Sequence, residues 1–237
     1  MTKAINLLGI LATLIWTGVI AIIAVPVFLF SEKLGHVCHR AWGRYSLALL
    51  GIRLSIEGIE NLPHEGGFIL APNHESYFDI LVMSALPIDF KWVSKQEVKR
   101  IPFIGWTMKA MRCFFVRRDS SGHDLNVMRD IENGLKSGKG IVLFPEGTRT
   151  RTGELLPFKK GAFRTAQNSV VPLIPIALQG TRAIAQAGKL PERRGMKVGV
   201  RIGKPFVVGP HEPIPQAMVR YREILTQLIA DRVNSGC

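Results

Sequence analysis

The sequence predicts an α/β protein with a mixed, largely parallel sheet flanked by helices, preceded by an N-terminal apolar helical hairpin associated with a membrane. From Gly51 onward, short apolar runs alternate with segments of helical periodicity, which is typical of layered α/β domains. Hydrophobic residues make up 47% of the 237 residues and charged residues 21%, so the chain should fold rather than stay disordered. We therefore expect membrane-anchoring helices over 1–50 and an α/β domain over 51–237.

The N-terminal stretch from Ala4 to Phe30 contains no charged residue. As a helix, residues 5–30 would extend about 39 Å at ~1.5 Å per residue, against a hydrocarbon core of roughly 30 Å. A cleavable signal peptide is the alternative, but its apolar region is normally shorter and ends in small residues. The residues Pro26–Phe30 are a poor cleavage site, so the sequence predicts a retained membrane anchor.

Flanking charge predicts the orientation of this anchor. Lys3 precedes the apolar stretch, and three basic residues follow it: Lys33, Arg40 and Arg44. The positive-inside rule then places the downstream domain in the cytoplasm. A second segment, His36–Leu50, has near-helical apolar spacing and carries Trp42 and Tyr45, which suit headgroup depth. The hairpin could lie in one leaflet or span the bilayer, and the sequence leaves both open. We expect His36, Cys38 and His39 to be interface side chains rather than metal ligands.

Each strand and helix of the α/β domain is assigned from its pattern. The expected strands are Ile52–Ile56, Phe68–Ala71, Phe90–Val93, Phe114–Val116, Ile141–Phe144, Leu173–Leu178, Val198–Ile202 and Phe206–Val208. The expected helices are Ile80–Leu86, Leu125–Lys136, Ala162–Gln167 and Pro215–Val233. The helix from Leu125 has the clearest apolar stripe, with Asp119–Ser121 available for capping. Thr181–Gly195 is basic and predicted to be a surface loop.

Charge and cysteine content narrow the functional classes. The net charge of +13 and the pI near 10.1 indicate polyanionic partners: nucleic acid, anionic lipid or phosphorylated substrates. The leading membrane segment and the dispersed charge favour lipid over nucleic acid. Cys38, Cys113 and Cys237 are scattered, with no Cys-x2-Cys, so neither a disulfide framework nor a zinc site is indicated.

The run Asn73–Asp79 carries the first chemical motif. His74 stands five positions before Asp79, directly after a predicted apolar strand. A carboxylate that fixes the tautomer of an imidazole makes it an effective general base. No Gly-x-Ser-x-Gly elbow occurs in the sequence, so the attacking nucleophile is expected to be a hydroxyl of the substrate. On this spacing alone, a structural pair in a loop is the commoner arrangement.

The second motif follows the strand predicted at Ile141–Phe144. Glu146, Gly147, Thr148 and Arg149 come after it, where ligands gather in open α/β sheets. Gly147 permits close backbone approach, and Arg149 can hold a phosphate bidentately. The alternative interpretation is a turn with a solvated Glu–Arg pair.

Two further blocks supply cations and a proline-rich strand. Arg117 and Arg118 end a short strand, and alternation lets one of them face a pocket. Lys95 follows another predicted strand and is a third candidate cation. Val171–Pro175 is an apolar strand interrupted by prolines, which we interpret as architectural.

Together the four blocks resemble the glycerolipid acyltransferase superfamily. Asn73-His74-x4-Asp79 is similar to its first motif, and Phe115–Arg118 is similar to its second. Phe144–Arg149 is similar to the third, and Val171–Pro175 to the fourth. The resemblance covers roughly residues 51–210. The compact chain with an apolar N-terminus is most similar to the bacterial members that acylate lysophosphatidic acid.

The resemblance implies a role for each motif residue. His74 would deprotonate the sn-2 hydroxyl of lysophosphatidic acid as it attacks an acyl thioester, and Asp79 would orient His74. The implied substrate-binding residues are Arg149, Arg118, Glu146, Gly147, Thr148, Lys95 and Asn73. The co-substrate would be acyl-CoA or acyl carrier protein bearing the acyl group, with no cofactor and no metal ion.

The resemblance also implies a product and a cellular location, and it leaves two alternative functions open. The product would be phosphatidic acid, made for phospholipid biosynthesis at the cytoplasmic face of the bacterial inner membrane, in contact with anionic lipid. The same chemistry on another acceptor, such as glycerol 3-phosphate or a different lysophospholipid, is the first alternative. A non-catalytic module that binds anionic lipid is the second.

Overall fold

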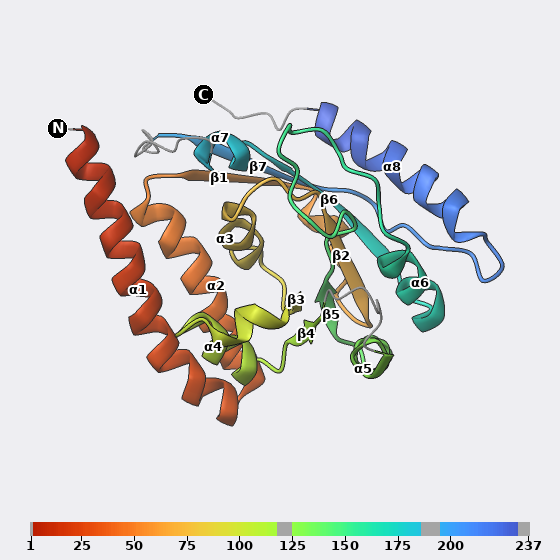
Figure 1. Ribbon diagram of the computed structural model, residues 1–237, viewed down its shortest axis with the longest axis horizontal. Coiled ribbons are helices and arrows are strands. Elements are labelled where there is room, and N and C mark those ends of the chain that lie inside the picture. The colour runs from red at the N-terminus through yellow and green to blue at the C-terminus, as the bar shows by residue number, and fades with distance from the viewer. Residues whose placement is uncertain (1, 118–124, 186–194, 232–237) are drawn as a thin grey trace.

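A seven-stranded sheet with helices on both faces forms the centre of the computed structural model, which describes residues 2–117, 125–185 and 195–231 (Figure 1). The strands are β1 (Arg53–Glu57), β2 (Phe68–Pro72), β3 (Lys91–Lys95), β4 (Phe114–Val116), β5 (Gly140–Val142), β6 (Leu173–Gln179) and β7 (Lys197–Ile202). Their order is β1-β7-β6-β2-β5-β3-β4. All neighbours are parallel except β6 and β7, which are antiparallel. The predicted mixed, largely parallel sheet is therefore confirmed.

The helices include the two expected near the N-terminus. They are α1 (Thr2–Phe30), α2 (Glu32–Leu49), α3 (Phe78–Ser84), α4 (Ile104–Ala110), α5 (Leu125–Lys136), α6 (Lys160–Ser169), α7 (Thr181–Ala185) and α8 (Ile214–Ala230). Ser31 separates α1 from α2: its backbone is extended, and its hydroxyl accepts a hydrogen bond from the Leu34 N–H. This cap starts the second helix and lets the chain reverse.

Three local predictions differ from the structure. The strand expected at Phe206–Val208 is a single antiparallel bridge between Phe206 and Leu173, because prolines on both sides cannot extend a ladder. The start of the expected surface loop, Thr181–Ala185, is the short helix α7. Helix α4 was not predicted, since its segment shows exposed apolar residues rather than an amphipathic stripe. The capping residues proposed for α5 lie outside the described residues.

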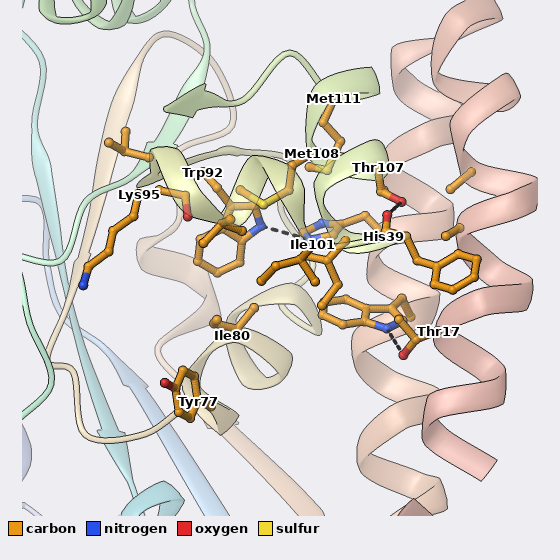
Figure 2. A pocket seen from close by; sticks show the side chains of 18 of the residues that line it. Thr17, His39, Tyr77, Ile80, Trp92, Lys95, Ile101, Thr107, Met108 and Met111 are labelled. Atoms are coloured by element: carbon orange, nitrogen blue, oxygen red, sulfur yellow. Dashed lines mark hydrogen bonds between the residues drawn. The ribbon is translucent and has the colours of Figure 1, made fainter. Parts of the chain in front are cut away.

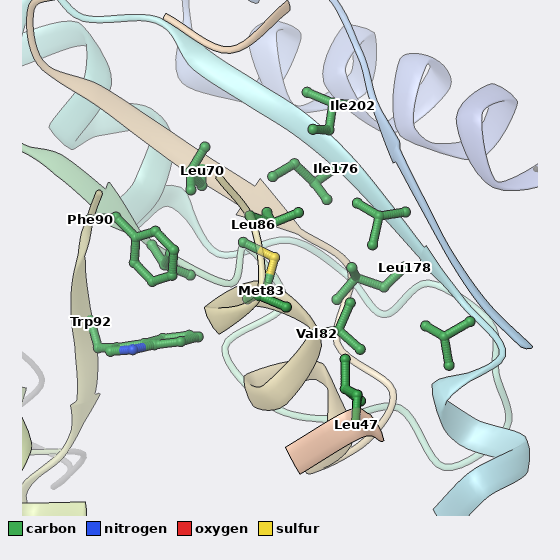
Figure 3. Close-up of a cluster of buried hydrophobic side chains, with 14 of the residues drawn as sticks. Leu47, Leu70, Val82, Met83, Leu86, Phe90, Trp92, Ile176, Leu178 and Ile202 are labelled. Atoms are coloured by element: carbon green, nitrogen blue, oxygen red, sulfur yellow. The ribbon is translucent and has the colours of Figure 1, made fainter. Parts of the chain in front are cut away.

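Alternation along each strand divides the core into two layers. In β2, Leu70 faces one layer, whereas Ile69 and Ala71 face the other. The first layer packs the sheet against α1, α2, α3, α4 and α7, and Figure 3 shows its centre. The second packs the sheet against α5, α6 and α8, with Phe163 and Tyr221 fully buried. Helices thus cover both faces, as parallel strands require.

Helix α1 is apolar on the side that faces away from the protein. It packs against α2 and α4, while large side chains such as Leu14, Ile22 and Phe30 remain exposed. By length and composition, Ala4–Phe30 meets the requirement for crossing a membrane, and it is the one described helix that does. A large exposed apolar surface of this kind suits contact with lipid.

We predict that the α2–α3 contact tolerates no side chain at Gly43. An added Cβ would lie 2.7 Å from the Ala85 nitrogen and 2.8 Å from the Leu81 oxygen, so the helices would have to separate. Gly43→Ala should lower the free energy of unfolding by about 1–3 kcal/mol, measured by denaturant titration followed by circular dichroism. Gly161→Ala in α6 is the control, because nothing lies within 4 Å of its added Cβ. Equal stability of the two variants would contradict the close helix contact.

Candidate active site

The candidate active site lies where three neighbouring parallel strands end. The loop carrying His74 follows β2, the loop carrying Glu146 to Arg149 follows β5, and Lys95 ends β3. The carboxyl ends of parallel strands share one edge of the sheet, so side chains far apart in the sequence meet there. This is the edge that the sequence motifs predicted.

His74 and Asp79 are in direct contact. The distance between His74 Nδ1 and Asp79 Oδ2 is 2.7 Å, and the Asp79 side chain is fully buried. Because a carboxylate only accepts, Nδ1 carries a proton, and in the neutral imidazole Nε2 then has the free lone pair. The imidazole is therefore held in the tautomer that can accept a proton at Nε2.

Backbone groups hold the Asp79 carboxylate in place. Asp79 lies in the first turn of α3, and its Oδ2 also accepts hydrogen bonds from the Glu75 and Ser76 N–H groups, at 2.7 and 2.9 Å. These donors offset part of the cost of burying a charged group, while Oδ1 is buried with no hydrogen-bond partner among the described residues. The His74 ring and the two N–H groups that follow it in the loop therefore all contact the same oxygen, Asp79 Oδ2.

Glu146 ties the two loops together. Its Oε1 accepts from the His74 N–H and its Oε2 from the Leu156 N–H, both at 2.8 Å. The His74 carbonyl in turn accepts from the Thr150 N–H at 2.9 Å. Burial raises the pKa of the Glu146 carboxyl, and the two backbone hydrogen bonds oppose that rise. Both carboxylate oxygens are directed at backbone rather than at the cavity.

Phe144 packs against the His74 ring, and Gly147 forms the turn that follows Phe144. The Phe144 ring stacks on His74 with centroids 3.9 Å apart, which limits rotation of the imidazole. Gly147 has a φ of 67°, and an added Cβ would lie 2.9 Å from the Lys159 side chain. Only glycine accepts both constraints at low cost. Lys159, which was not predicted, brings another cation to this turn.

Arg149 packs on a residue that the sequence analysis did not select. Its guanidinium carbon lies 3.5 Å from the centre of the Tyr77 ring, a close cation–π contact. Tyr77 lies inside the His74–Asp79 motif, but its spacing alone indicated no function. Thr148 is exposed beside Arg149, and Lys95 is exposed at the end of β3. All four residues line the same cavity.

The remaining predicted residues are placed differently. Asn73 is buried: it accepts from the Leu178 N–H and donates to the Leu178 carbonyl and to Glu75. It therefore joins the loop to β6 and does not line the cavity. Burial, with the nearby Asp79 carboxylate, raises the pKa of Glu75 to about 7. Arg118 lies outside the described residues.

A cavity of about 380 Å³ extends from His74 toward the N-terminal helices. This volume is within the range of small-molecule sites. Figure 2 shows Tyr77 and Lys95 at one end and Thr17 of α1 at the other, with α4 residues such as Met108 between them. The lining is mostly apolar, so an alkyl chain fits its chemistry.

Two tryptophan N–H groups in the cavity wall form hydrogen bonds with neighbouring side chains. The Trp92 indole N–H donates to His39 Nε2 at 3.2 Å, and the Trp42 indole N–H donates to Thr17 Oγ1 at 3.0 Å. The expectation that His36 and His39 lie at the membrane interface was wrong, since both are buried against aromatic rings. Within the described ranges, no cluster of three metal-ligating side chains occurs.

Comparison with known proteins identifies the family of this chain. The acyltransferase family model matches residues 53–179, from β1 to β6. The chain is 34% identical over 178 residues to the 1-acyl-sn-glycerol-3-phosphate acyltransferase LPAT1 of Arabidopsis thaliana chloroplasts, covering 75% of this chain and 50% of that protein. It is 32% identical over 179 residues to the 1-acyl-sn-glycerol-3-phosphate acyltransferase of Bacillus subtilis, covering 74% of this chain and 85% of that one. The chain thus spans about half the length of the plant relatives that it matches.

A solved structure shares the fold over the whole chain. The crystal structure of the 1-acyl-sn-glycerophosphate acyltransferase PlsC from Thermotoga maritima superposes with a TM-score of 0.75 at 23% identity, covering 100% of both chains. The family match spans the loops that carry His74 and Glu146 and the start of α3, which carries Asp79. On this evidence the chain belongs to the acyltransferase family.

Proposed function

We propose that this protein transfers a fatty acyl group from an acyl thioester to the sn-2 hydroxyl of lysophosphatidic acid, giving phosphatidic acid. The 2.7 Å contact between His74 Nδ1 and Asp79 Oδ2, at the mouth of an apolar cavity, carries the proposal. The names of the relatives from Arabidopsis and Bacillus support the choice of acceptor. An acyl-transfer assay with lysophosphatidic acid, glycerol 3-phosphate and other lysophospholipids tests that choice.

The reaction follows from the tautomer of His74. Nε2 takes the proton of the acceptor hydroxyl while that oxygen attacks the thioester carbonyl. Asp79 stabilises the imidazolium that forms. The tetrahedral intermediate then expels the thiolate, which takes the proton from His74, and an ester bond replaces the thioester bond. The donor, acyl-CoA or acyl carrier protein bearing the acyl group, is already activated, so no cofactor or metal ion enters the scheme.

Arg149 is the proposed ligand of the acceptor phosphate. It is half-buried at the cavity mouth, and its packing on Tyr77 orders the guanidinium before the substrate binds. Lys95 and Thr148 lie on the same rim and would add a second cation and a hydroxyl. Arg118 stays a predicted phosphate ligand. The acyl chain would occupy the apolar part of the cavity.

Glu146, Gly147 and Asn73 act in this proposal as positioning residues. The hydrogen-bonding atoms of Glu146 and Asn73 contact backbone or Glu75, and Gly147 gives the turn its conformation. Substrate binding by these residues would therefore be indirect. They hold His74 and Arg149 in a fixed relation.

We further propose that α1 lies within one leaflet, at the cytoplasmic face of the bacterial inner membrane. Helix α1 packs on α2, and α2 packs on α3 and β1 of the catalytic part. If α1 crossed the bilayer, it would pull charged side chains of α2 and β1, such as Arg40, Arg44 and Arg53, into the hydrocarbon core. A position along the interface leaves its exposed apolar side in lipid and the cavity mouth accessible.

His74→Ala should lower kcat by roughly 10²–10⁴-fold, because the general base is lost. Asp79→Asn should lower kcat by a comparable factor, since an amide cannot hold the same tautomer or stabilise the imidazolium. Initial rates with a thioester donor and lysophosphatidic acid measure both effects. Thermal unfolding and vesicle binding should stay close to wild type. Full activity of Asp79→Asn would make the carboxylate purely structural.

Arg149→Ala should raise the KM for lysophosphatidic acid and reduce kcat/KM by about 10–100-fold. This factor corresponds to the free energy that hydrogen bonds between the guanidinium and a charged phosphate contribute. Monoacylglycerol lacks the phosphate, so its kcat/KM should not change. Arg164→Ala, at an exposed position on α6, is the matched control. An equal loss with both acceptors would remove Arg149 from the phosphate site.

Glu146→Gln should lower kcat while leaving the KM for lysophosphatidic acid nearly unchanged. A glutamine amide has one acceptor oxygen, so it cannot accept from both the His74 and the Leu156 N–H groups, and His74 is then held less firmly. The lost acceptor leaves one buried N–H unsatisfied, which should lower the free energy of unfolding by about 1–3 kcal/mol. Steady-state kinetics and denaturant titration read the two effects. Glu154→Gln, exposed in the same loop, is the control. A raised KM with unchanged kcat would instead favour direct substrate binding by Glu146.

A further inference from the structure

The segment between β3 and β4 exposes a run of apolar side chains. Ile101, Phe103 and Ile104 of this run also line the cavity, whereas Trp106 does not. It contains a 3₁₀ helix (Gln96–Arg100) and α4, joined by Ile101–Phe103. The residues from Ile101 to Ile104 are all exposed, and the Trp106 side chain is 50% exposed. We call Ile101–Trp106 the α4 tip. Four consecutive exposed apolar residues are unfavourable in water unless they meet a partner.

The backbone of the α4 tip is held in an unusual conformation. Phe103 has φ 62° and ψ −58°, which a phenylalanine rarely adopts. Its ring meets the Trp106 ring edge-on, with centroids 5.1 Å apart. The fold therefore maintains a strained turn that groups two aromatic rings at the surface, and such strain is often associated with a functional site.

The α4 tip continues the apolar face of α1. Helix α4 packs on α1, and a Cβ added at Gly18 would lie 3.8 Å from the Phe103 ring. On α1, Leu14, Ile15 and Ile22 are exposed. The two elements thus present neighbouring apolar surfaces, one from a helix and one from a turn.

Basic side chains flank the α4 tip. Lys99, Arg100, Lys109 and Arg112 are all exposed. Between Lys95 and Arg112 the sequence has one acidic residue, Glu97. An apolar centre with a cationic rim is complementary to an anionic bilayer, where tryptophan also favours the interface. A second copy of the chain would oppose these cations with like charges.

We infer that the α4 tip inserts into the anionic lipid interface beside α1 as a second membrane contact. Ile101, Phe103 and Ile104 of the tip line the cavity. Val98, Met108 and Met111 of the same segment line it as well. The inserted segment is therefore a wall shared by the bilayer and the cavity, and it brings the cavity to the lipid. This inference rests on the proposed acylation of a membrane lipid.

Fluorescence quenching tests the location directly. The full chain is bound to vesicles of phosphatidylethanolamine and phosphatidylglycerol that carry brominated acyl chains. The emission of Trp106, obtained as wild type minus Trp106→Phe, should be strongly quenched. A tryptophan placed at the exposed α8 position Val219, in the Trp106→Phe protein, should not be quenched. Equal quenching at both positions, or at neither, would overturn the inference.

Kinetics with the acceptor in detergent and in vesicles test whether insertion of the α4 tip helps the enzyme reach a membrane substrate. Trp106 does not line the cavity, so Trp106→Ser should leave turnover of detergent-solubilised lysophosphatidic acid unchanged. With the same acceptor in the anionic vesicles, its KM should rise several-fold, whereas Val219→Ser should match wild type in both formats. Unchanged kinetics of Trp106→Ser on vesicles would contradict the inference.

The two proposals fail in different ways. If wild type formed no phosphatidic acid in either format, the proposed function would be wrong, while the quenching would still report the location of the α4 tip. If Trp106 were shielded only when acyl carrier protein was added or when the chain self-associated, the surface would bind protein rather than lipid.

Discussion

The carboxylate of Glu146 accepts one backbone hydrogen bond from His74 and one from Leu156, and the rest of the site depends on this pair of contacts. They join the loop after β2 to the loop after β5, so His74 and Arg149 keep a fixed position relative to each other. Arg222 of α8 extends the same arrangement by donating to the carbonyls of Leu155 and Leu156. A buried carboxylate is costly unless it is hydrogen-bonded, which makes this loop conformation specific.

The same site joins two environments. On one side the sheet edge supplies the polar chemistry of His74, Asp79 and Arg149. On the other side α1, α2 and α4 supply an apolar cavity wall in which the tryptophan N–H groups of Trp42 and Trp92 are already paired. An amphipathic lipid needs both environments at once. The N-terminal helices are therefore part of the cavity wall, and α1 is also long and apolar enough to meet a membrane.

Periodicity located most of the fold because it reflects burial directly. The apolar strands and the helices α1, α2, α3, α5, α6 and α8 were predicted within a few residues of their observed bounds. Helix α4 was not predicted because its exposed side is also apolar, so its sequence lacks the alternation of polar and apolar residues that marks an amphipathic helix. The bridge at Phe206 was taken for a strand because its apolar residues pack in the core, while the flanking prolines prevent pairing.

The sequence by itself determined the fold class and the pairing of His74 with Asp79, because the five-residue spacing is local and one loop can close it. It also identified Arg149 and Lys95, two cations that line the cavity, since charge can be read without coordinates. Only the tertiary structure decided that Glu146 and Asn73 turn to the backbone, that Tyr77 supports Arg149, and that His39 lies in a cavity wall. Each of these depends on contacts between residues far apart in the chain or on the direction of a side chain, which a one-dimensional pattern does not encode.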